Sequence, residues 1–282
     1  MDSGIVFVQW DSNPSRWARS PSVPNYRGQV RRVVRESLVF WIISLMAFVA
    51  GLVQGLTGFG AGIILMVALP SFFDVVEAAG VSQAICLVIV FLMFWRYRSH
   101  VSARKVVPPL VLFLAVSWTT ILVAQSSDQD VLKILLGAFL VVFSLYKLFW
   151  ASGEQKPLSL PAKAVCIALA GLCDGLFGIG GPPMVIYYAA NTESTEEYLG
   201  TLQAFFLVTT ISSLVFRLSR GALTMAALPT VAVGIVCVVA GLTVANHLVS
   251  RLDDAVMRRL TYAFMGVAGV YYVVSAAMAL LV

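Results

Sequence analysis

Charged side chains are scarce in this sequence. Asp, Glu, Lys and Arg together make up 12% of the 282 residues, whereas a soluble domain carries about 25%. Hydrophobic residues make up 60%. Segments of roughly 20 apolar residues recur between short polar breaks, which is the length that a helix needs to cross about 30 Å of hydrocarbon. A soluble core with polar helix faces is therefore excluded, and the composition indicates a polytopic membrane protein.

Metal-ligating side chains are equally scarce. The chain has two histidines, each in or beside an expected loop, and four cysteines, all within apolar segments. No cysteine pair has the CxxC spacing of a zinc or redox site, so these thiols are expected to be small buried hydrophobic groups. We predict no metal site and no cofactor. An enzyme is disfavoured as well, because the interior of the apolar segments holds one Asp and no His to serve as catalytic groups.

Eight apolar segments are predicted, and all are expected to be helical. An open sheet would leave backbone groups unpaired in lipid, and the strict alternation of a membrane barrel is missing. The predicted fold is therefore an all-α polytopic membrane protein of about eight transmembrane segments. These segments occupy residues 37–70, 78–96, 106–125, 131–150, 160–190, 199–217, 223–247 and 259–282.

Residues 1–35 differ from the rest of the chain. They contain several Pro and Ser and six Arg against two Asp, a composition typical of a disordered segment, and no signal peptide is recognisable. Basic residues favour the cytoplasmic side of a membrane. The tail and every second connection are basic, the connection with Arg217 and Arg220 included, so the amino terminus is predicted to be cytoplasmic. The basic connection 251–259 does not fit this alternation.

Glycine is concentrated in two stretches, "GLVQGLTGFGAG" at 51–62 and "GLCDGLFGIGGPP" at 171–183. At an offset of 120 residues, seven of the twelve positions from 50 to 61 are identical in the second stretch, and Gln83 falls on Gln203. We predict a tandem duplication, with one membrane repeat at 37–150 and the other at 160–282. Internal repeats of this kind are common in transporters. Parallel repeats, which the loop charges favour, and inverted repeats with re-entrant first segments both stay open.

The first segment of each repeat is too long for a single crossing. Glycine costs about 1 kcal/mol relative to alanine inside a helix, and Pro182 with Pro183 suits the first turn of a new helix. A helix is therefore expected to end near Gly58 or Gly178, and a shorter one to begin just after it. Broken backbone within a membrane must be buried in protein or line a wet cavity, and the amino terminus of a half-helix attracts anions. Close helix packing through GxxxG spacing is the alternative role for these glycines.

The motifs "GLVQGLTGFGAGIILMVALP" and "GLCDGLFGIGGPPMVIYYAA" resemble the paired glycine-rich signatures of the sulfite exporter TauE/SafE family, the toluene sulfonate uptake permease group. The resemblance covers nearly the whole chain beyond the tail. It implies a secondary transporter of about eight helices in two repeats, which moves sulfite, organosulfonates or other small sulfur-containing or organic anions across the plasma membrane. Gly60, Ala61 and Gly62 stand where a longer glycine run is common in the family, so the first site is expected to be slightly narrower.

The predicted substrate site combines both glycine motifs with the helices that follow them. Gln83 and Gln203 are expected to donate amide hydrogen bonds to the anion, with ordinary interhelical bonding as the alternative. No Lys or Arg lies at the centre of an apolar segment, so backbone dipoles and amides are expected to hold the anion. The predicted site residues are Gln54, Thr57, Gly58, Phe59, Gly60, Gln83, Phe177, Gly178, Gly180, Gly181 and Gln203.

Asp174 stands where the first motif has Gln54. Burial and repulsion from a bound anion both favour the neutral acid, which makes Asp174 the candidate for coupling proton movement to anion movement. Capping of a half-helix end is its alternative role. An anion channel is the alternative to a transporter, although no selectivity filter is recognisable. The expected partners are a small anion and the lipid bilayer, without nucleic acid, and a homodimer is left open.

Overall fold

The computed structural model describes residues 26–149, 158–248, 270–274 and 278. All regular structure in these ranges is helical, in agreement with the predicted all-α class. Six described stretches are long and apolar enough to cross a membrane, namely Phe40–Thr57, Val75–His100, Ala103–Ser126, Leu160–Phe177, Thr195–Ser219 and Met225–His247. The predicted segment 259–282 lies largely outside the described residues, so the predicted total of eight segments stays a prediction.

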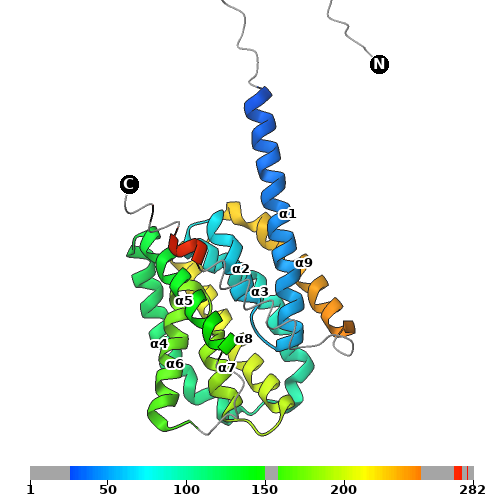
Figure 1. Cartoon of the computed structure of the whole chain (residues 1–282). Helices are drawn as coiled ribbons and strands as arrows, with labels where there is room; N and C mark the ends of the chain where they lie inside the picture. Colours follow the sequence, from blue (N-terminus) through cyan, green and yellow to red (C-terminus); the bar gives the residue numbers. More distant parts are fainter. Residues whose placement is uncertain (1–25, 150–157, 249–269, 275–277, 279–282) are drawn as a thin grey trace, which may run out of the picture. The chain divides into compact units, whose positions relative to one another are not determined.

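Nine α-helices follow one another along the described chain (Figure 1). Single helical turns at Leu69–Ser71, Arg98–His100 and Met225–Ala227 extend or join them. The helices are α1 (Tyr26–Thr57), α2 (Ala61–Ala68), α3 (Val75–Tyr97), α4 (Ala103–Ser126), α5 (Gln129–Phe149), α6 (Leu160–Phe177), α7 (Gly181–Ala189), α8 (Thr195–Ser219) and α9 (Leu228–Leu248).

The chain divides into two compact units, residues 1–38 and residues 39–282. The described part of the first unit is the start of α1. Residues 26–35, which the sequence analysis included in the tail, are therefore helical, whereas residues 1–25 lie outside the described residues and their predicted disorder stays a prediction. The membrane-spanning stretches all belong to the second unit.

Both glycine motifs interrupt a helix, as the sequence predicted. Gly58 and Gly178 adopt positive φ angles of 82° and 68°, a conformation that glycine reaches without strain. Their N–H groups donate to the carbonyls of Gln54 (2.8 Å) and Asp174 (2.7 Å), respectively. The two breaks thus share one mechanism, a left-handed glycine that closes the preceding helix.

The chain reverses direction at the second break. Gly171 packs against the carbonyl of Phe113, and Gly175 packs against Ser117 and the next turn of α4, so α6 and α4 run in the same direction. After the break Gly180 again lies against Phe113, and the Tyr188 hydroxyl donates to the carbonyl of Lys105. Because α7 leads back along α4, α6 and α7 form a hairpin within the membrane unit.

The first break reverses the chain in the same way. Gly51 packs against Val238 and Gly55 against Ala245, so α1 runs parallel to α9. Gly62 then lies beside Ser82 in the second turn of α3, and α2 leads from there to the start of α3. The sequence analysis counted each broken segment as one crossing. Because each broken segment turns back instead of crossing, the connections that follow it change sides. The alternation of basic and acidic connections therefore no longer supports the predicted orientation.

The glycines of each motif divide into two groups with different roles. Cβ atoms at Gly51 and Gly171 would lie 2.0 Å and 2.8 Å from carbonyl oxygens of α9 and α4. No substituent fits at these positions, and such close approach of backbones is how helices associate in lipid. The later glycines form the breaks. The GxxxG alternative and the broken-helix prediction therefore both hold, for different residues of the same motif.

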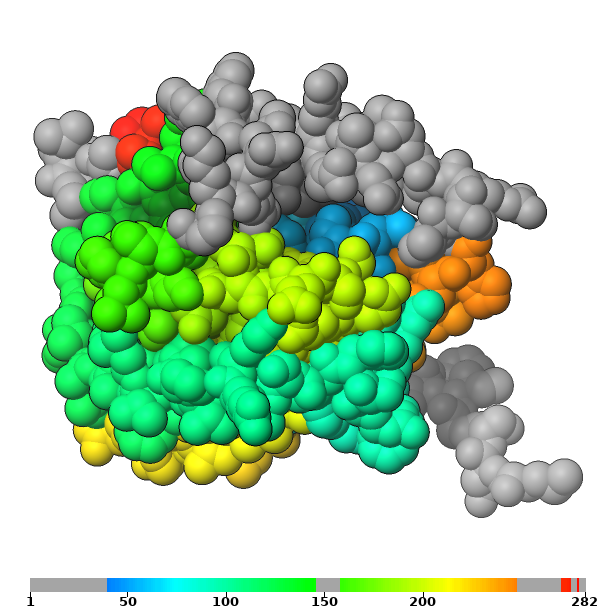
Figure 2. All heavy atoms as spheres, turned by 90° about the horizontal axis from the view of Figure 1, so that it is seen from below, coloured from blue at the N-terminus to red at the C-terminus, as the bar shows by residue number. Residues whose placement is uncertain are grey.

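Helices α3 and α8 form an antiparallel pair at the centre of the unit. Gln83 near the start of α3 contacts Arg217 near the end of α8, whereas Gly200 near the start of α8 packs against the carbonyl of Tyr97. On the face seen in Figure 2, turquoise residues around the start of α4 lie beside yellow-green residues of α7 and α8. This pair and the two hairpins enclose the candidate site.

Candidate functional site

A cavity of about 60 Å³ lies between the two helix breaks. This volume exceeds the share of one water molecule, about 30 Å³, and lies well below the roughly 300–1,000 Å³ of pockets for drug-sized ligands. The cavity therefore suits a small ion. Its lining comes from both hairpins and from α3 and α8: Gln54, Phe59, Gly60, Gly62, Ile63, Cys86, Val90, Gly178, Ile179, Gly181, Phe206 and Thr210.

The amino-terminal turn of α2 supplies hydrogen-bond donors at this cavity. The first N–H groups of a helix have no partner within the helix. Ala61 N–H donates to the side-chain oxygen of Gln54 at 3.1 Å, and the next two residues, Gly62 and Ile63, line the cavity. Among the described residues no partner binds the side-chain nitrogen of Gln54. The N–H groups at the start of α2 and the side-chain amide of Gln54 thus border a small space that suits an anion.

The start of α7 is chemically different. Pro182 and Pro183 occupy its first turn and carry no N–H. Gly181 lines the cavity and supplies the one backbone donor before these prolines. The two half-helices are therefore unequal, because α2 offers more backbone donors than α7.

Asp174 belongs to a buried polar cluster contributed by four helices. Its Oδ2 accepts hydrogen bonds from the hydroxyls of Ser117 and Ser213, both at 2.6 Å, and its Oδ1 accepts one from Gln83 Nε2 at 3.0 Å. Arg217 Nε donates to Gln83 Oε1 at 3.1 Å. Arg217 Nη2 donates to the backbone carbonyls of Asp174 and Gly175 at 2.8 and 2.7 Å. The Asp174 carboxylate thus binds side chains of three other helices, and none of these bonds caps a half-helix end.

The position of Arg217 corrects the sequence analysis, which assigned this residue to a basic connection at the end of the segment 199–217. Arg217 lies within α8, and its side chain is 0% exposed. It is tolerated there because Asp174 provides an opposite charge and the carboxyl-terminal carbonyls of α6 accept its hydrogen bonds. A usable signal existed, since a buried carboxylate such as Asp174 needs a partner. The sequence did not identify which cation supplies it.

The predicted site residues divide into those that line the cavity and those that do not. Gln54, Phe59, Gly60, Gly178 and Gly181 line it. The others support the loops: for example, the Thr57 hydroxyl donates to the carbonyls of Val53 and Phe59, and Gln203 Nε2 donates to the Gly58 carbonyl at 2.5 Å. Their binding roles stay predictions. The residues outside the cavity lining are Thr57, Gly58, Gln83, Phe177, Gly180 and Gln203.

The cavity also has lining residues that the sequence analysis missed. Glycine spacing identified the breaks but did not show which turns of α3 and α8 pack beside them. The offset of 120 offers one signal, because Val90 and Thr210 are equivalent positions and both line the cavity. Residues of this kind are Gly62, Ile63, Cys86, Val90, Ile179, Phe206 and Thr210.

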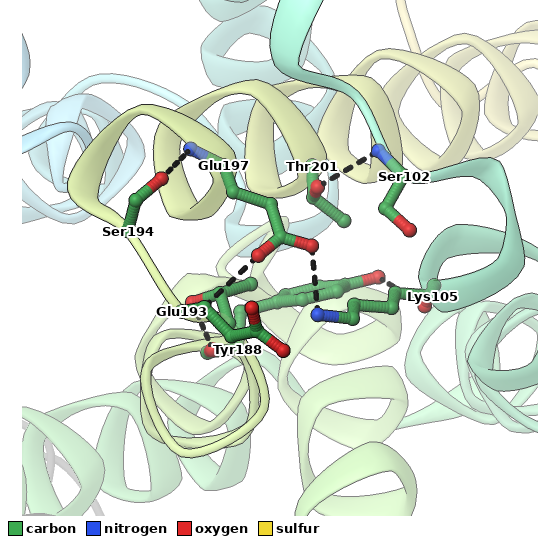
Figure 3. Close-up of polar contacts among 8 residues, drawn as sticks. Ser102, Lys105, Tyr188, Glu193, Ser194, Glu197 and Thr201 are labelled. Carbon is green, nitrogen blue, oxygen red and sulfur yellow. Dashed lines mark hydrogen bonds and ion pairs between the residues drawn. The ribbon is translucent and has the colours of Figure 1, made fainter.

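A second polar cluster, at the outer end of α7, ties the second hairpin to its neighbours (Figure 3). Lys105 Nζ lies 2.7 Å from Glu197 Oε1, and Ser194 caps α8 by accepting from the Glu197 N–H. The Tyr188 hydroxyl donates to the Lys105 carbonyl. These contacts join α4, α7 and α8 at one end of the unit. In the described ranges no group of three or more His, Cys, Asp or Glu side chains is arranged to hold a metal ion.

Comparison of the sequence with known proteins identifies the family of this chain. The sequence profile described as sulfite exporter TauE/SafE matches residues 43–272. A relative from Cupriavidus necator, described as a probable sulfite/organosulfonate exporter TauE, is 25% identical over 224 residues, which cover 75% of this chain and 85% of the relative. No solved structure matches this chain.

Proposed function

The chain belongs to the sulfite exporter TauE/SafE family, and we propose that it is a secondary transporter that moves small anions, sulfite or organosulfonates among them, across the plasma membrane. The observation that supports this proposal most directly is the cavity between two membrane hairpins, lined by the amino-terminal turn of α2. Its volume of about 60 Å³ favours sulfite and anions of similar size over bulky aromatic sulfonates in this conformation.

Flux into proteoliposomes tests the proposal. The purified protein is expected to give saturable uptake of ³⁵S-labelled sulfite and counterflow of the label against unlabelled sulfite. Sulfoacetate, thiosulfate, sulfate and small carboxylates tested as competitors define the substrate range. Conductance that does not saturate and shows no counterflow would instead identify an anion channel. Absence of both flux and binding for every anion in the panel would reject the proposed function.

We further propose that the membrane unit consists of two inverted repeats with hairpins as their first elements. At an offset of 120 the end of α1 at residue 57 falls on the end of α6 at 177, and the start of α3 at 75 falls on the start of α8 at 195. Equivalent helices that cross in opposite directions imply inversion, and α3 and α8 are antiparallel. Cysteines placed at the equivalent Ser99 and Ser219 should therefore be labelled from opposite sides of the membrane.

The arginine-rich tail supports a cytoplasmic amino terminus. With that orientation, the reversals place the basic connection between α3 and α4 on the opposite side, so the orientation needs a direct measurement. A reporter that is active only in the cytoplasm, fused in turn to each terminus, provides one.

Proton coupling through Asp174 is a finer proposal. Among the described residues Asp174 is the one carboxyl group buried in the membrane unit. The hydroxyls of Ser117 and Ser213 can accept as well as donate hydrogen bonds, so the cluster can also accommodate a neutral acid. The groups that contact Asp174 from α3, α4 and α8 include one charge, that of Arg217. An anion close to Arg217 would replace Asp174 as its counter-charge and favour proton uptake by the carboxylate.

A further inference from the structure

One face of α8 carries polar side chains from the central cavity toward one end of the unit. Thr210, Ser213 and Arg217 follow one another at spacings of three or four residues, so they share one face of the helix, and Arg220 directly follows the helix end. Thr210 lines the central cavity, and Ser213 and Arg217 belong to the buried cluster around Asp174.

Arg220 lines a second cavity at the end of α8, which we name the vestibule. The vestibule has a volume of about 450 Å³ and a mixed charge. Its carboxylates, Asp74 and Glu77, lie beside Arg220, but Glu77 accepts hydrogen bonds from Thr224. The polar face of α8 therefore connects the small central cavity to a larger space at the end of the helix.

The equivalent face of α3 lacks these polar and basic side chains. At the offset of 120, Thr210, Ser213 and Arg217 correspond to Val90, Met93 and Tyr97. Val90 lines the same central cavity, and Met93 is buried. The polar face is thus confined to one of the two helices of the central pair, although both helices contribute to the cavity.

Arg217 holds a donor that the fold does not use. The whole side chain is buried, and its Nη1 has no hydrogen-bond partner. The Asp174 carboxylate does not lie within 4 Å of the guanidinium nitrogens, since Ser117, Ser213 and Gln83 bind it instead. The bond to Gln83 accounts for Nε and the capping of α6 accounts for Nη2, but neither explains Nη1. Leaving a buried charged donor unpaired is costly, so a functional reason for it is expected.

We propose that Arg217 is a transit binding site for the anion, at which Nη1 binds a sulfite-like oxyanion as it moves along α8 between the central cavity and the vestibule. The proposal rests on the proposed transport function and adds to it a route and a second binding residue. Tyr97, the equivalent residue on α3, offers no charge, so the route on that side requires different contacts or a movement of the first hairpin.

Thiol labelling tests the route without requiring transport. In a chain whose four cysteines are replaced by alanine, Cys is introduced for Thr210 in the cavity wall. The rate of modification by the anionic sulfonatoethyl methanethiosulfonate is divided by the rate for neutral methyl methanethiosulfonate. Arg217→Met should lower this ratio about tenfold, whereas Arg98→Met, which removes an exposed charge elsewhere, should leave it unchanged. An unchanged ratio in the Arg217 variant overturns the proposal.

Transport kinetics separate a transit site from a merely structural cap. Arg217→Met should reduce ³⁵S-sulfite flux by about 100-fold, and Arg217→Lys should restore most of the maximal rate with a raised KM. Thermal unfolding of the purified variants is measured in parallel. If Arg217→Lys unfolds as readily as Arg217→Met and restores no flux, the role is structural and the proposal fails. Absence of flux and binding in the wild-type protein rejects the transport function, while the labelling ratio still decides the route.

Discussion

The hairpins α1–α2 and α6–α7 share a helix break at a left-handed glycine but differ in chemistry. Each ends its first helix at a left-handed glycine and returns beside a central helix. In the first hairpin Gln54 binds the start of α2 at the cavity. In the second, the equivalent Asp174 binds side chains of α3, α4 and α8, and prolines remove N–H donors from α7. The two hairpins are thus similar frameworks with different contents: the first places hydrogen-bond donors at the cavity, and the second holds a charge cluster.

The largest effect is expected from Gly60→Val in the first hairpin. Gly60 has a φ of 108°, which a β-branched residue adopts only with severe strain, and it lines the cavity. We expect ³⁵S-sulfite flux to fall by at least about 100-fold, equivalent to about 2.7 kcal/mol, while the protein still inserts into the membrane.

Gly221→Val is the matched control for this strain. Gly221 also has a positive φ, of 69°, and no atom lies within 4 Å of the Cβ position. It lies in the wall of the vestibule and outside the central cavity. This variant should lose stability and keep sulfite affinity. Equal loss of affinity in the two variants would show that backbone strain, and not the shape of the cavity, is the cause.

Asp174→Asn in the second hairpin is expected to have the next largest effect on transport. Asn keeps the shape of the side chain and mimics the neutral acid, so transport should persist but lose its dependence on the proton gradient. It also removes the carboxylate charge from the buried cluster that contains Arg217, which should lower the free energy of unfolding. Added sulfite should restore more stability to this variant than to the wild type.

Flux at several pH values in the presence and absence of a proton gradient is the measurement, with Glu196→Gln, which alters an exposed acid, as the control. An Asp174→Asn variant that keeps the wild-type pH profile would assign Asp174 a structural role and end the coupling proposal.

A smaller effect is expected from Gln54→Ala in the first hairpin. The substitution removes the acceptor for Ala61 N–H, and loss of such a bond at a buried group costs about 1–3 kcal/mol. Sulfite affinity, measured by isothermal titration calorimetry, should fall about tenfold. Ser194→Ala is the control, because Ser194 accepts from the N–H of Glu197 at the start of α8 and lines neither the central cavity nor the vestibule. If both variants lose affinity equally, the first hairpin has no special role in binding.

The all-helical class, the two breaks and the family were predictable from the sequence because each depends on local composition. Apolar length predicts spans, and glycine followed by proline predicts a helix break. The reversal at the breaks was not predictable, because Gly58 and Gly178 end a helix whether the chain continues or turns back. The direction after a break depends on packing against distant helices, as the contact of Gly180 with Phe113 illustrates.

The candidate site was partly predictable for the same reason. Gln54, Gly60 and Gly178 were identified because they lie in the motifs that form the cavity. Arg217 was missed because it lies at the end of an apolar segment, where a basic residue usually reaches the membrane surface. Its burial depends on Gln83 and on the end of α6, which are remote in sequence.

The smallest effect is expected at the outer ends of the two frameworks. Glu197, beside the second hairpin, pairs with Lys105, whereas the equivalent Glu77 binds the uncharged Thr224. The side chains of Lys105 and Glu197 are 31% and 22% exposed, and partly exposed pairs contribute about 0.2–1 kcal/mol. Lys105→Met should therefore lower the free energy of unfolding by at most about 1 kcal/mol, and the loss should shrink at high salt because screening already weakens the pair in the wild type.

Thermal unfolding at low and high salt measures this, with Lys133→Met, which breaks the pair with Asp130 on α5, as the control. A loss that is large and independent of salt would mean that the ion pair fixes the second hairpin in place, and the two frameworks would then differ in rigidity as well as in chemistry.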